Sequence, residues 1–332
     1  MAEALSLGQL AELAAAPADP DPPSPFSARP YLLIDGSGGA LLDAPDRRQA
    51  AAWLRRLPCP TLAIAGADGV LDACDVVVSM AAELTPLIRA IEAAPIAATI
   101  LVQLLRATET ADIADGLFAE SLAYATLQSG PEFRRWLAGR KPVEPDARQD
   151  PGPPVLIEHT GGGLEIRLNR PARRNAISIE LRDALVEAFA LIAADPSIER
   201  ARVSGIGRCF SIGGDLAEFG TVPDPATGHV VRSLRLPAAM LARSADRVSC
   251  HLHGACIGAG IELPAFARRV TASPDAFFQL PELRFGLIPG AGGCISLPRR
   301  IGRQRTAWLA LSGRRINAAT ALAWGLVDEV IR

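Results

Sequence analysis

Two glutamates in glycine-rich surroundings are the residues of this sequence best suited to chemistry. Glu262 ends the segment HGACIGAGIE (253–262), which predicts a strand, a glycine turn and the start of a helix. Glu282 follows Pro281 and precedes a second glycine-rich stretch, GLIPGAGG (286–293). Two carboxylates that flank an activated carbonyl compound can hold a water molecule and move protons. One glutamate alone is usually a solvated surface residue, so the argument rests on the pair.

The glycine-rich turns offer a second kind of functional group, the backbone N–H. FSIGGD (210–215) follows a predicted strand, and the small residues of such a turn let a ligand approach the backbone. A helix that starts near Gly258 would direct its N–H groups and its positive dipole end to the same place. Two such donors converging on one oxygen form an oxyanion hole, in which one donor stabilises a transition state by roughly 3 kcal/mol.

The sequence gives little indication of a metal site, a nucleotide phosphate site or a serine hydrolase site. His251 and His253 share a strand face, but two histidines without a third ligand make a weak metal site, and packing is the favoured interpretation. The glycine clusters do not follow the G-x-G-x-x-G pattern, and there is no P-loop lysine, which argues against a nucleotide phosphate site. The G-x-S-x-G pattern of serine hydrolases is also missing. We therefore expect no metal ion.

Composition narrows the class of protein. The chain has 332 residues, 49% of them hydrophobic, and a formal net charge of -2. This is enough apolar material for a large buried core and too much for a mainly disordered chain. The charge balance argues against nucleic-acid binding, because a duplex binder usually carries a basic face. No run reaches the ~18 uncharged apolar residues of a membrane helix.

The cysteines and the first residues indicate the compartment. The segment MAEALSLGQL (1–10) contains an acid and no basic n-region, unlike a secretory signal. The six cysteines form no C-x-x-C pair and suggest neither a disulfide framework nor a metal site. Reduced, buried cysteines are typical of a cytoplasmic protein, which is what we expect here, with no membrane or nucleic-acid partner. The cysteines are Cys59, Cys74, Cys209, Cys250, Cys256 and Cys294.

Proline-rich segments divide the chain. Six prolines fall within residues 17–30, so residues 1–30 are predicted to form a Pro-rich leader. Residues 31–142 begin with two strand candidates, continue with helical apolar spacing and carry no catalytic motif, which predicts a mainly helical N-terminal part. Residues 143–154 are predicted to be a linker. Residues 155–332 alternate strands with helices, as in an α/β domain.

The second part contains the elements that must position the glutamates. VLIEH and LEIRL flank three glycines (161–163) and predict a β-hairpin. RARVSG, VSCHLH and RRVTAS are short strand candidates, separated by glycine-rich turns and helices. Ser178 is placed to cap a helix that has one apolar face. The loops at the ends of these strands are then available for a site.

Five segments resemble the enoyl-CoA hydratase/isomerase (crotonase) superfamily, in family order, and cover essentially all of residues 155–332. The resemblance implies an α/β fold with a crotonase-type (ClpP/crotonase) repeated ββα core. It implies an acyl-CoA substrate, no cofactor beyond the coenzyme A of that substrate, and a homotrimer or homohexamer. The segments are LNRPARRNAIS (168–178), CFSIGGDL (209–216), HGACIGAGIEL (253–263), LPELRFGLIPGAGG (280–293) and ALSGRRINAATALAWGLVDEV (310–330).

The resemblance also implies roles for single residues. Gly214 and Ala259 match the two family positions whose N–H groups bind the thioester oxygen. Glu262 and Glu282 match the two carboxylates that enoyl-CoA hydratases use, and Gly290 matches the glycine near the catalytic water. The other positions that the resemblance implies for substrate binding are Arg174, Ala176, Ser211, Ile212, Asp215, Gly258 and Pro281.

The implied reaction is the addition of water to the 2,3 double bond of an enoyl-CoA. Glu282 would exchange a proton with the substrate, and Glu262 would orient the water. The alternatives are another acyl-CoA reaction, such as isomerisation, thioester hydrolysis or C–C cleavage, and a non-catalytic acyl-CoA-binding subunit, because a fold does not fix a reaction. Residues 217–245, a variable region in the family, would select the acyl group.

Two departures from the family pattern stand out. Pro264 falls inside the predicted helix after Gly258, where an interior proline costs about 3 kcal/mol unless the helix start shifts. The chain also stops at 327–332, where crotonases continue into helices that close the acyl pocket. Residues 70–142 resemble that C-terminal segment, with an E-L start, an L-L-R helix end and an R-K-P ending. We therefore expect a circularly permuted arrangement, the alternative being an unrelated N-terminal helical domain.

Overall fold

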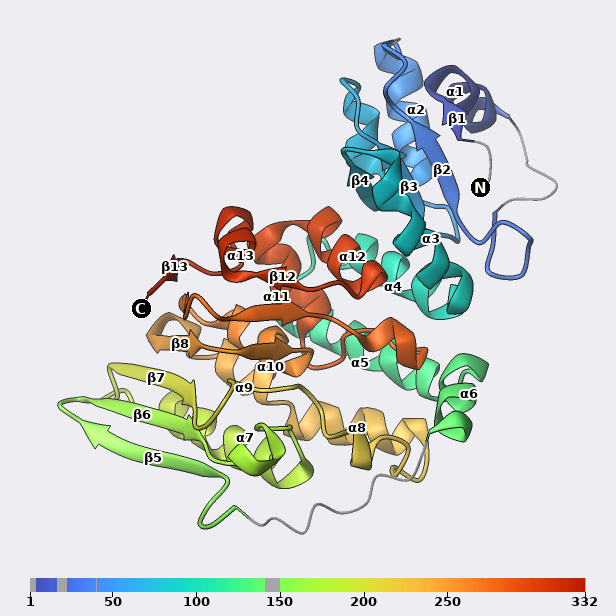
Figure 1. Ribbon diagram of the computed structural model, residues 1–332. Coiled ribbons are helices and arrows are strands. Elements are labelled where there is room, and N and C mark those ends of the chain that lie inside the picture. Colours follow the sequence, from blue (N-terminus) through green and yellow to red (C-terminus); the bar gives the residue numbers. More distant parts are fainter. Residues whose placement is uncertain (1–3, 17–22, 40, 141–149, 332) are drawn as a thin grey trace.

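The structure, a computed structural model, describes residues 4–16, 23–39, 41–140 and 150–331. The fold is α/β, as the sequence predicts, with three sheets and helices packed around them. Figure 1 shows a core that is made from the second half of the chain, with the first strands of the chain in a separate group at the upper right.

The large sheet of the core consists of a hairpin followed by parallel strands. β5 (Val155–Thr160) pairs antiparallel with β6 (Gly163–Leu168), which confirms the predicted hairpin. The other neighbours pair in parallel, in the order β13-β10-β8-β7-β6. Buried and half-buried residues alternate along β8, because successive side chains of a strand point to opposite faces. The parallel strands are β7 (Arg200–Gly205), β8 (Val248–Leu252), β10 (Arg269–Ala272) and β13 (Glu329–Val330).

A small sheet lies beside the large one. β9 (Ala255–Ile257) pairs in parallel with β11 (Phe277–Gln279), which pairs antiparallel with β12 (Ile316–Asn317). After a short turn, β8 of the large sheet continues into β9, and β10 continues into β11 in the same way. Helical residues follow each of these strand pairs. This succession is the repeated ββα core that the sequence predicts.

The two longest helices of the core begin at side-chain caps. Ser178 Oγ accepts a hydrogen bond from the N–H of Leu181, and Asp224 caps the next long helix in the same manner. Proline at the first position of a helix costs little, because its missing N–H has no intrahelical partner there. The helices are α7 (Ile179–Ala194), α8 (Pro225–Arg235), α9 (Pro237–Ala242), α10 (Ala259–Glu262), α11 (Gly293–Ile301), α12 (Arg303–Ser312) and α13 (Ala318–Trp324).

Pro264 does not lie within a long helix. α10 ends at Glu262, and Pro264 is the first residue of the 3-10 turn Pro264–Phe266. At that position the ring nitrogen has no hydrogen bond to donate, so the expected cost of an interior proline does not arise. The predicted helix after Gly258 is therefore a single turn, and this turn carries Glu262.

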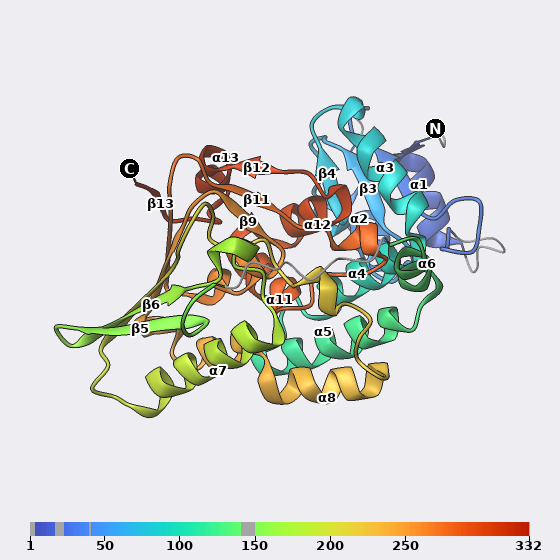
Figure 2. The same ribbon diagram turned by 60° about the horizontal axis from the view of Figure 1, so that its bottom comes forward.

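Four helices of the N-terminal part pack directly on the core. α5 lies beside α8 in both views and also contacts α11, while α3 and α4 contact α12 (Figures 1 and 2). One hydrophobic cluster includes buried residues of these helices and of the core. Within the described residues no single helix is long and apolar enough to cross a membrane, although Ala81–Ala93 and Pro95–Ala107, bent by 109°, satisfy length and composition together. The helices are α3 (Leu84–Ala93), α4 (Pro95–Ala107), α5 (Ile113–Gln128) and α6 (Pro131–Gly139).

The first strands form a sheet of their own, which the sequence analysis did not predict. Its four strands are parallel, in the order β1-β2-β3-β4, and a separate hydrophobic cluster lies between this sheet and helices α1 and α2. The mainly helical prediction for 31–142 thus describes α3 to α6, and the two strand candidates at its start correspond to β2 and β3. The elements are β1 (Leu5–Ser6), α1 (Leu7–Ala15), β2 (Leu32–Asp35), α2 (Ala44–Leu54), β3 (Thr61–Ile64) and β4 (Val76–Val78).

The predicted leader also contains regular structure. Ser6 and Gln9 form a reciprocal capping box at the start of α1, and Leu10 of that helix is fully buried. A cap and an apolar face stabilise this short helix against the sheet, which outweighs the proline-rich composition of the residues after it. Residues 17–22 of the leader and 143–149 of the predicted linker lie outside the described residues.

Candidate active site

Three loops that carry predicted site residues leave the small sheet at the same level. Ser211 forms a parallel bridge with Cys256, and Cys256 pairs with Phe278 of β11, so that the three residues form a row. The carboxyl ends of parallel strands meet at one edge of a sheet, so the loops after this row emerge side by side. The residues three positions beyond the row are Gly214, Ala259 and Pro281.

The N–H groups of Gly214 and Ala259 are available for a ligand. Ile177 donates to the carbonyl of Gly213 at 2.8 Å and accepts from the N–H of Asp215 at 3.1 Å, which engages the residues on both sides of Gly214. Ala259 begins α10, where an N–H group has no intrahelical acceptor. Neither N–H donates a hydrogen bond to any described residue, and both residues line one cavity. The two donors can therefore bind one oxygen.

The loops that hold the two donors touch. A β-carbon on Gly213 would lie 3.5 Å from the backbone nitrogen of Ala259 and 2.7 Å from the carbonyl oxygen of Ile257. The φ angle of Gly213 is also positive, at 84°. Glycine at this position therefore permits the close approach of the two loops that carry the N–H groups of Gly214 and Ala259.

The cavity in front of these donors has a volume of about 510 Å³, the size of many small-ligand sites. The predicted specificity region 217–245 supplies much of its wall, from α8, α9 and the loop before them. An apolar wall of this kind suits an aliphatic acyl chain. The apolar residues are Ile177, Ile179, Phe219, Val222, Pro223, Val231, Leu236, Pro237, Ala238 and Leu263.

Glu262 enters the cavity from the single turn of α10 and is held firmly. Its side chain is almost fully buried, and its Oε2 accepts hydrogen bonds from the N–H of Ala291 at 2.7 Å and of Gly293 at 3.0 Å. Burial raises the pKa of Glu262 to about 7, and the two N–H groups act in the opposite direction by favouring the carboxylate. This residue can therefore exist as an oriented carboxylate near neutral pH.

Glu282 enters from the turn that follows β11 and is held more loosely. Its Oε2 is buried and has no hydrogen-bond partner among the described residues. Burial, followed by the negative charge of Glu262, raises the pKa of Glu282 well above its ordinary value. A buried carboxyl group of this kind favours the protonated form and can donate a proton to a ligand in the cavity.

Gly258 shows that the two carboxyl groups face the same small space. A β-carbon on this residue would lie 2.5 Å from Oε1 of Glu282 and 3.7 Å from Oε1 of Glu262. The φ angle of Gly258 is positive, at 52°, so a side chain here would be strained as well as crowded. Glycine at this position is therefore needed for both the backbone turn and the carboxyl pair.

A third buried glutamate, Glu120, comes from α5 of the N-terminal part. Its two oxygens accept from the N–H of Gly292 at 2.7 Å and of Cys294 at 2.8 Å, and its side chain is almost fully buried. Glu120 and Glu262 thus engage alternate N–H groups at the start of α11. Burial, with the charge of Glu262 adding to it, raises the pKa of Glu120 to about 8.

Tyr124 and Arg232 complete the wall on the side of the N-terminal part. The Tyr124 ring lies against Gly290, where a β-carbon would come within 2.2 Å of it, and burial raises the pKa of the Tyr124 hydroxyl above its ordinary value. The Arg232 guanidinium lies over the same ring, 4.6 Å from its centre. The sequence analysis identified none of Glu120, Tyr124 and Arg232. Glu120 is the one charged residue of α5 after its first turn, and this was the available signal.

The predicted site residues divide into two groups. Six of them line the cavity or the space between the carboxyl groups directly, and Gly258 lies against Glu282. Ser211 instead supports the loop that contains Gly214. Its Oγ donates to the carbonyl of Asn175 and accepts from the N–H of Gly213. Arg174, Ala176 and Ile212 do not line the cavity; the carbonyl of Arg174 accepts hydrogen bonds from the N–H of Ile212 and from Sγ of Cys209. The six lining residues are Gly214, Asp215, Ala259, Glu262, Glu282 and Gly290.

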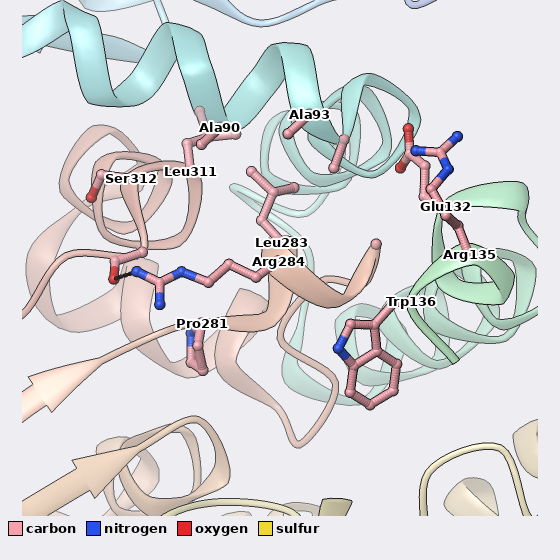
Figure 3. A pocket seen from close by; sticks show the side chains of 13 residues that line it. Ala90, Ala93, Glu132, Arg135, Trp136, Pro281, Leu283, Arg284, Leu311 and Ser312 are labelled. Carbon is pink, nitrogen blue, oxygen red and sulfur yellow. Dashed lines mark hydrogen bonds between the residues drawn. The ribbon is translucent and has the colours of Figure 1, made fainter. Parts of the chain in front are cut away.

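Pro281 belongs to a different, smaller cavity of about 230 Å³ between α3, α6 and the turn after β11 (Figure 3). Arg284, Trp136 and Glu132 surround this cavity in Figure 3. Arg284 donates to the carbonyl of Gly313 at 3.4 Å, and Glu132 accepts from the N–H groups at the start of α4. Arg284 and Glu132 thus have partners within the chain, and Pro281 lines this smaller cavity rather than the one that holds the carboxyl pair.

Asn175 is a further residue that the sequence analysis missed, although it lies inside the segment 168–178. Its side chain is fully buried, accepts from the N–H of Arg170 and donates to the carbonyls of Ile206, Cys209 and Phe210. Its φ angle of 52° is unusual for a residue other than glycine, and asparagine tolerates it better than most. These bonds hold the loop that carries the donor of Gly214.

The two histidines of β8 and its following turn have separate partners. His251 contacts the hydroxyls of Thr271 and Ser273, and His253 contacts the carbonyl of Gly207. No group of three or more His, Cys, Asp or Glu side chains within the described chain could hold a metal ion. All six cysteines are buried, and none forms a disulfide with another residue that the structure describes.

Comparisons with known proteins agree with this geometry. The family model described as enoyl-CoA hydratase/isomerase matches residues 158–332. The chain is 36% identical over 176 residues to a 2,3-dehydroadipyl-CoA hydratase of Escherichia coli, a match that covers 53% of this chain and 68% of that protein. It is 32% identical to a mevalonyl-coenzyme A hydratase of Aspergillus fumigatus, over 51% of this chain and 62% of that protein. This chain therefore spans less than two thirds of the length of that relative.

A solved structure shows the same fold. An enoyl-CoA hydratase from Thermoplasma volcanium superimposes with a TM-score of 0.50 at 35% sequence identity, and the match covers 54% of this chain and 72% of that one. The repeated ββα core, the carboxyl pair and the two available N–H groups are the features expected of a crotonase-type protein. The chain belongs to the enoyl-CoA hydratase/isomerase family.

Proposed function

We propose that this protein is an enzyme that adds water to the 2,3 double bond of an enoyl-CoA thioester. One observation carries the proposal: Glu262 and Glu282 face one cavity together with the available N–H groups of Gly214 and Ala259. A thioester carbonyl that accepts both N–H bonds gains negative charge on its oxygen more easily. Carbon 3 of the conjugated double bond then becomes open to attack by water.

The proposed proton transfers balance between the two glutamates. The carboxylate of Glu262 accepts one proton from the attacking water, whose oxygen forms a bond to carbon 3. Protonated Glu282 donates its proton to carbon 2, so that water is added overall and the two glutamates exchange protonation states. Transfer of that proton back between them completes the cycle. Coenzyme A takes part only as a portion of the substrate.

The different attachment of the glutamates supports this division of roles. Two backbone N–H groups hold Glu262 and favour its ionised form, as a residue that orients water requires. Oε2 of Glu282 has no partner among the described residues, and burial favours its protonated form. Two carboxyl groups whose environments favour different protonation states are suited to acid–base catalysis. Retention of both glutamates also favours hydration over isomerisation, which in this family can proceed with the second carboxylate alone.

A simple assay tests the proposal. Purified protein is expected to remove the ultraviolet absorbance of crotonyl-CoA, and Glu282→Gln is expected to lower this rate by roughly 10²–10⁴-fold, the usual contribution of a general acid. Calorimetry with butyryl-CoA checks that the variant still binds the ligand. The proposal fails if neither crotonyl-CoA nor longer enoyl-CoA thioesters are consumed, or if the variant matches the wild type.

We also propose that α3 to α6 take the place of the helices that follow the core in the family, as a circular permutation would place them. The contact of Glu120 with α11 and the position of Tyr124 in the cavity wall support this interpretation. The family suggests a homotrimer or homohexamer, and light scattering of the purified protein tests that assembly. A monomer at micromolar concentration would contradict it.

A further inference from the structure

Arg232 of α8 places a positive charge in the wall of the cavity. Its guanidinium donates to the hydroxyl of Ser121 at 3.1 Å, to the carbonyl of Ser121 at 3.3 Å and to the side-chain oxygen of Gln128 at 3.4 Å. All of these acceptors are neutral. Among the residues that the structure describes, no carboxylate forms an ion pair with Arg232.

Apart from the two glutamates of the carboxyl pair, the other charged residues of the cavity wall have partners. Arg182, the second arginine, donates two hydrogen bonds to Asp183. Asp215 lies 3.9 Å from Arg173 and accepts from the N–H of Ala217. Glu218 accepts from the N–H of Ile179. Arg232 is thus the lining cation without an ionic partner in the described part of the chain.

Glu120 is the nearest candidate for a counter-charge, but its carboxyl group is already engaged. Both of its oxygens accept N–H groups of α11, and burial raises its pKa to about 8, which favours the neutral acid at neutral pH. Burial also lowers the pKa of Arg232, although Tyr124 and Glu120 oppose that effect. A largely buried guanidinium without an anion is costly, and an anionic ligand would compensate for it.

The arrangement of the cavity indicates which ligand atom would reach Arg232. The thioester end of an acyl-CoA belongs at Gly214 and Ala259, and the acyl chain then runs along apolar side chains from α8 and α9. Tyr124, Gln128 and Arg232 form one polar part of the cavity wall, where α5 and α8 meet. A chain that ends in a methyl group would give Arg232 no anionic partner, whereas a carboxylate matches the donor fork of a guanidinium.

We propose, on the basis of the proposed function, that Arg232 binds a carboxylate at the far end of the acyl group, and that the substrate is the CoA monothioester of an unsaturated dicarboxylic acid. Arg232 selects the substrate, while Glu262 and Glu282 perform the reaction. The size of the pocket limits the length of the acyl group, so the two substrates of each test pair have acyl groups of the same length.

The test compares substrates that differ only at the far end of the acyl chain. The pairs are 2-pentenoyl-CoA with glutaconyl-CoA, and 2-hexenoyl-CoA with the six-carbon 2-enoyl-CoA that ends in a carboxylate. For at least one pair, we expect wild-type kcat/KM to be at least tenfold higher for the carboxylate-ended member. We expect Arg232→Gln to reduce that preference at least tenfold, and Arg235→Gln, an exposed neighbour on α8, to leave it unchanged.

A binding measurement separates this proposal from the proposed reaction. Wild-type protein is titrated with adipyl-CoA and with hexanoyl-CoA, which have no double bond and cannot be hydrated. Tighter binding of adipyl-CoA supports the carboxylate site even if no enoyl-CoA is turned over. Equal binding, or tighter binding of hexanoyl-CoA, overturns the proposal even if hydration is observed. This comparison needs no variant, so misfolding of Arg232→Gln cannot obscure the result.

Discussion

Single residues decide which protonation states the site can hold. Glu262, Glu282 and Glu120 are buried close together, so they do not all ionise near neutral pH. Backbone N–H groups favour the ionised form of Glu262, and no such group reaches Oε2 of Glu282 among the described residues. The site therefore contains a base and an acid that differ in their surroundings, although both are glutamates.

This difference predicts a pH profile for hydration. The reaction needs Glu262 ionised, and burial raises its pKa to about 7, so kcat/KM should fall as the pH is lowered through about 7. The reaction also needs Glu282 protonated, and its pKa is raised well above the ordinary value, so the decline on the alkaline side should come only at higher pH. Initial rates with crotonyl-CoA across this range check the prediction. A rate that stays constant down to the ordinary pKa of a glutamate would contradict it.

The turns between strands and helices set the distances in the site. Gly258 brings the start of α10 against Glu282, and a β-carbon there would lie 2.5 Å from Oε1 of Glu282. Gly302 provides a matched comparison, because its φ of 79° is also positive but a β-carbon would meet nothing within 4 Å. Substitutions at these two glycines can therefore distinguish the effect of backbone strain from the effect of displacing Glu282.

Alanine substitutions at these two glycines should differ in activity. Both variants should lose about 1–3 kcal/mol of unfolding free energy, because alanine is strained at positive φ. Gly258→Ala should in addition lower kcat at least 100-fold by displacing Glu282, whereas Gly302→Ala should keep its activity. Chemical denaturation and the crotonyl-CoA assay measure the two effects. Equal activity in both variants would show that Gly258 has no role in placing Glu282.

The elements that sequence patterns predicted well are those with strong local signals. Turn glycines connect the two strands of the β5–β6 hairpin, and Ser178 caps α7. Both elements can therefore be predicted from residues adjacent in the sequence. The strands of the first sheet have two to four residues and depend on parallel pairing between distant segments. The two apolar segments that became β2 and β3 were predicted as strands, whereas the shorter β1 and β4, and the parallel pairing of all four, were not.

At the scale of the whole molecule, the N-terminal helices and the core share one site. Glu120 bonds to residues 172 and 174 positions away, and Arg232 bonds to Ser121 across 111 positions. Contacts over such separations leave no local pattern. The sequence could therefore indicate the catalytic pair, which lies in recognisable segments, but not the residues that α5 adds to it.

Removal of Glu120 should weaken the whole molecule. Glu120→Ala leaves the N–H groups of Gly292 and Cys294 buried without acceptors, and each such group costs about 1–3 kcal/mol. Loss of the buried carboxyl group relieves part of this cost, so we expect a net loss of about 1–4 kcal/mol of unfolding free energy. Glu92→Ala, at an exposed position of α3, should change it by less than about 0.5 kcal/mol. Urea denaturation compares the variants, and equal stability would show that α5 does not support α11.

The fate of the oxygen from water tests the account most directly. Crotonyl-CoA is incubated with the protein in water labelled with oxygen-18, and the products are analysed by mass spectrometry. If the two glutamates catalyse hydration, the product is 3-hydroxybutyryl-CoA with one labelled oxygen at carbon 3. The rate for Glu282→Gln is then expected to be at least 100-fold lower. Label in a free carboxylic acid would indicate thioester hydrolysis, and an unlabelled rearranged thioester would indicate isomerisation. Either result, or full activity of the variant, would contradict hydration by the two glutamates.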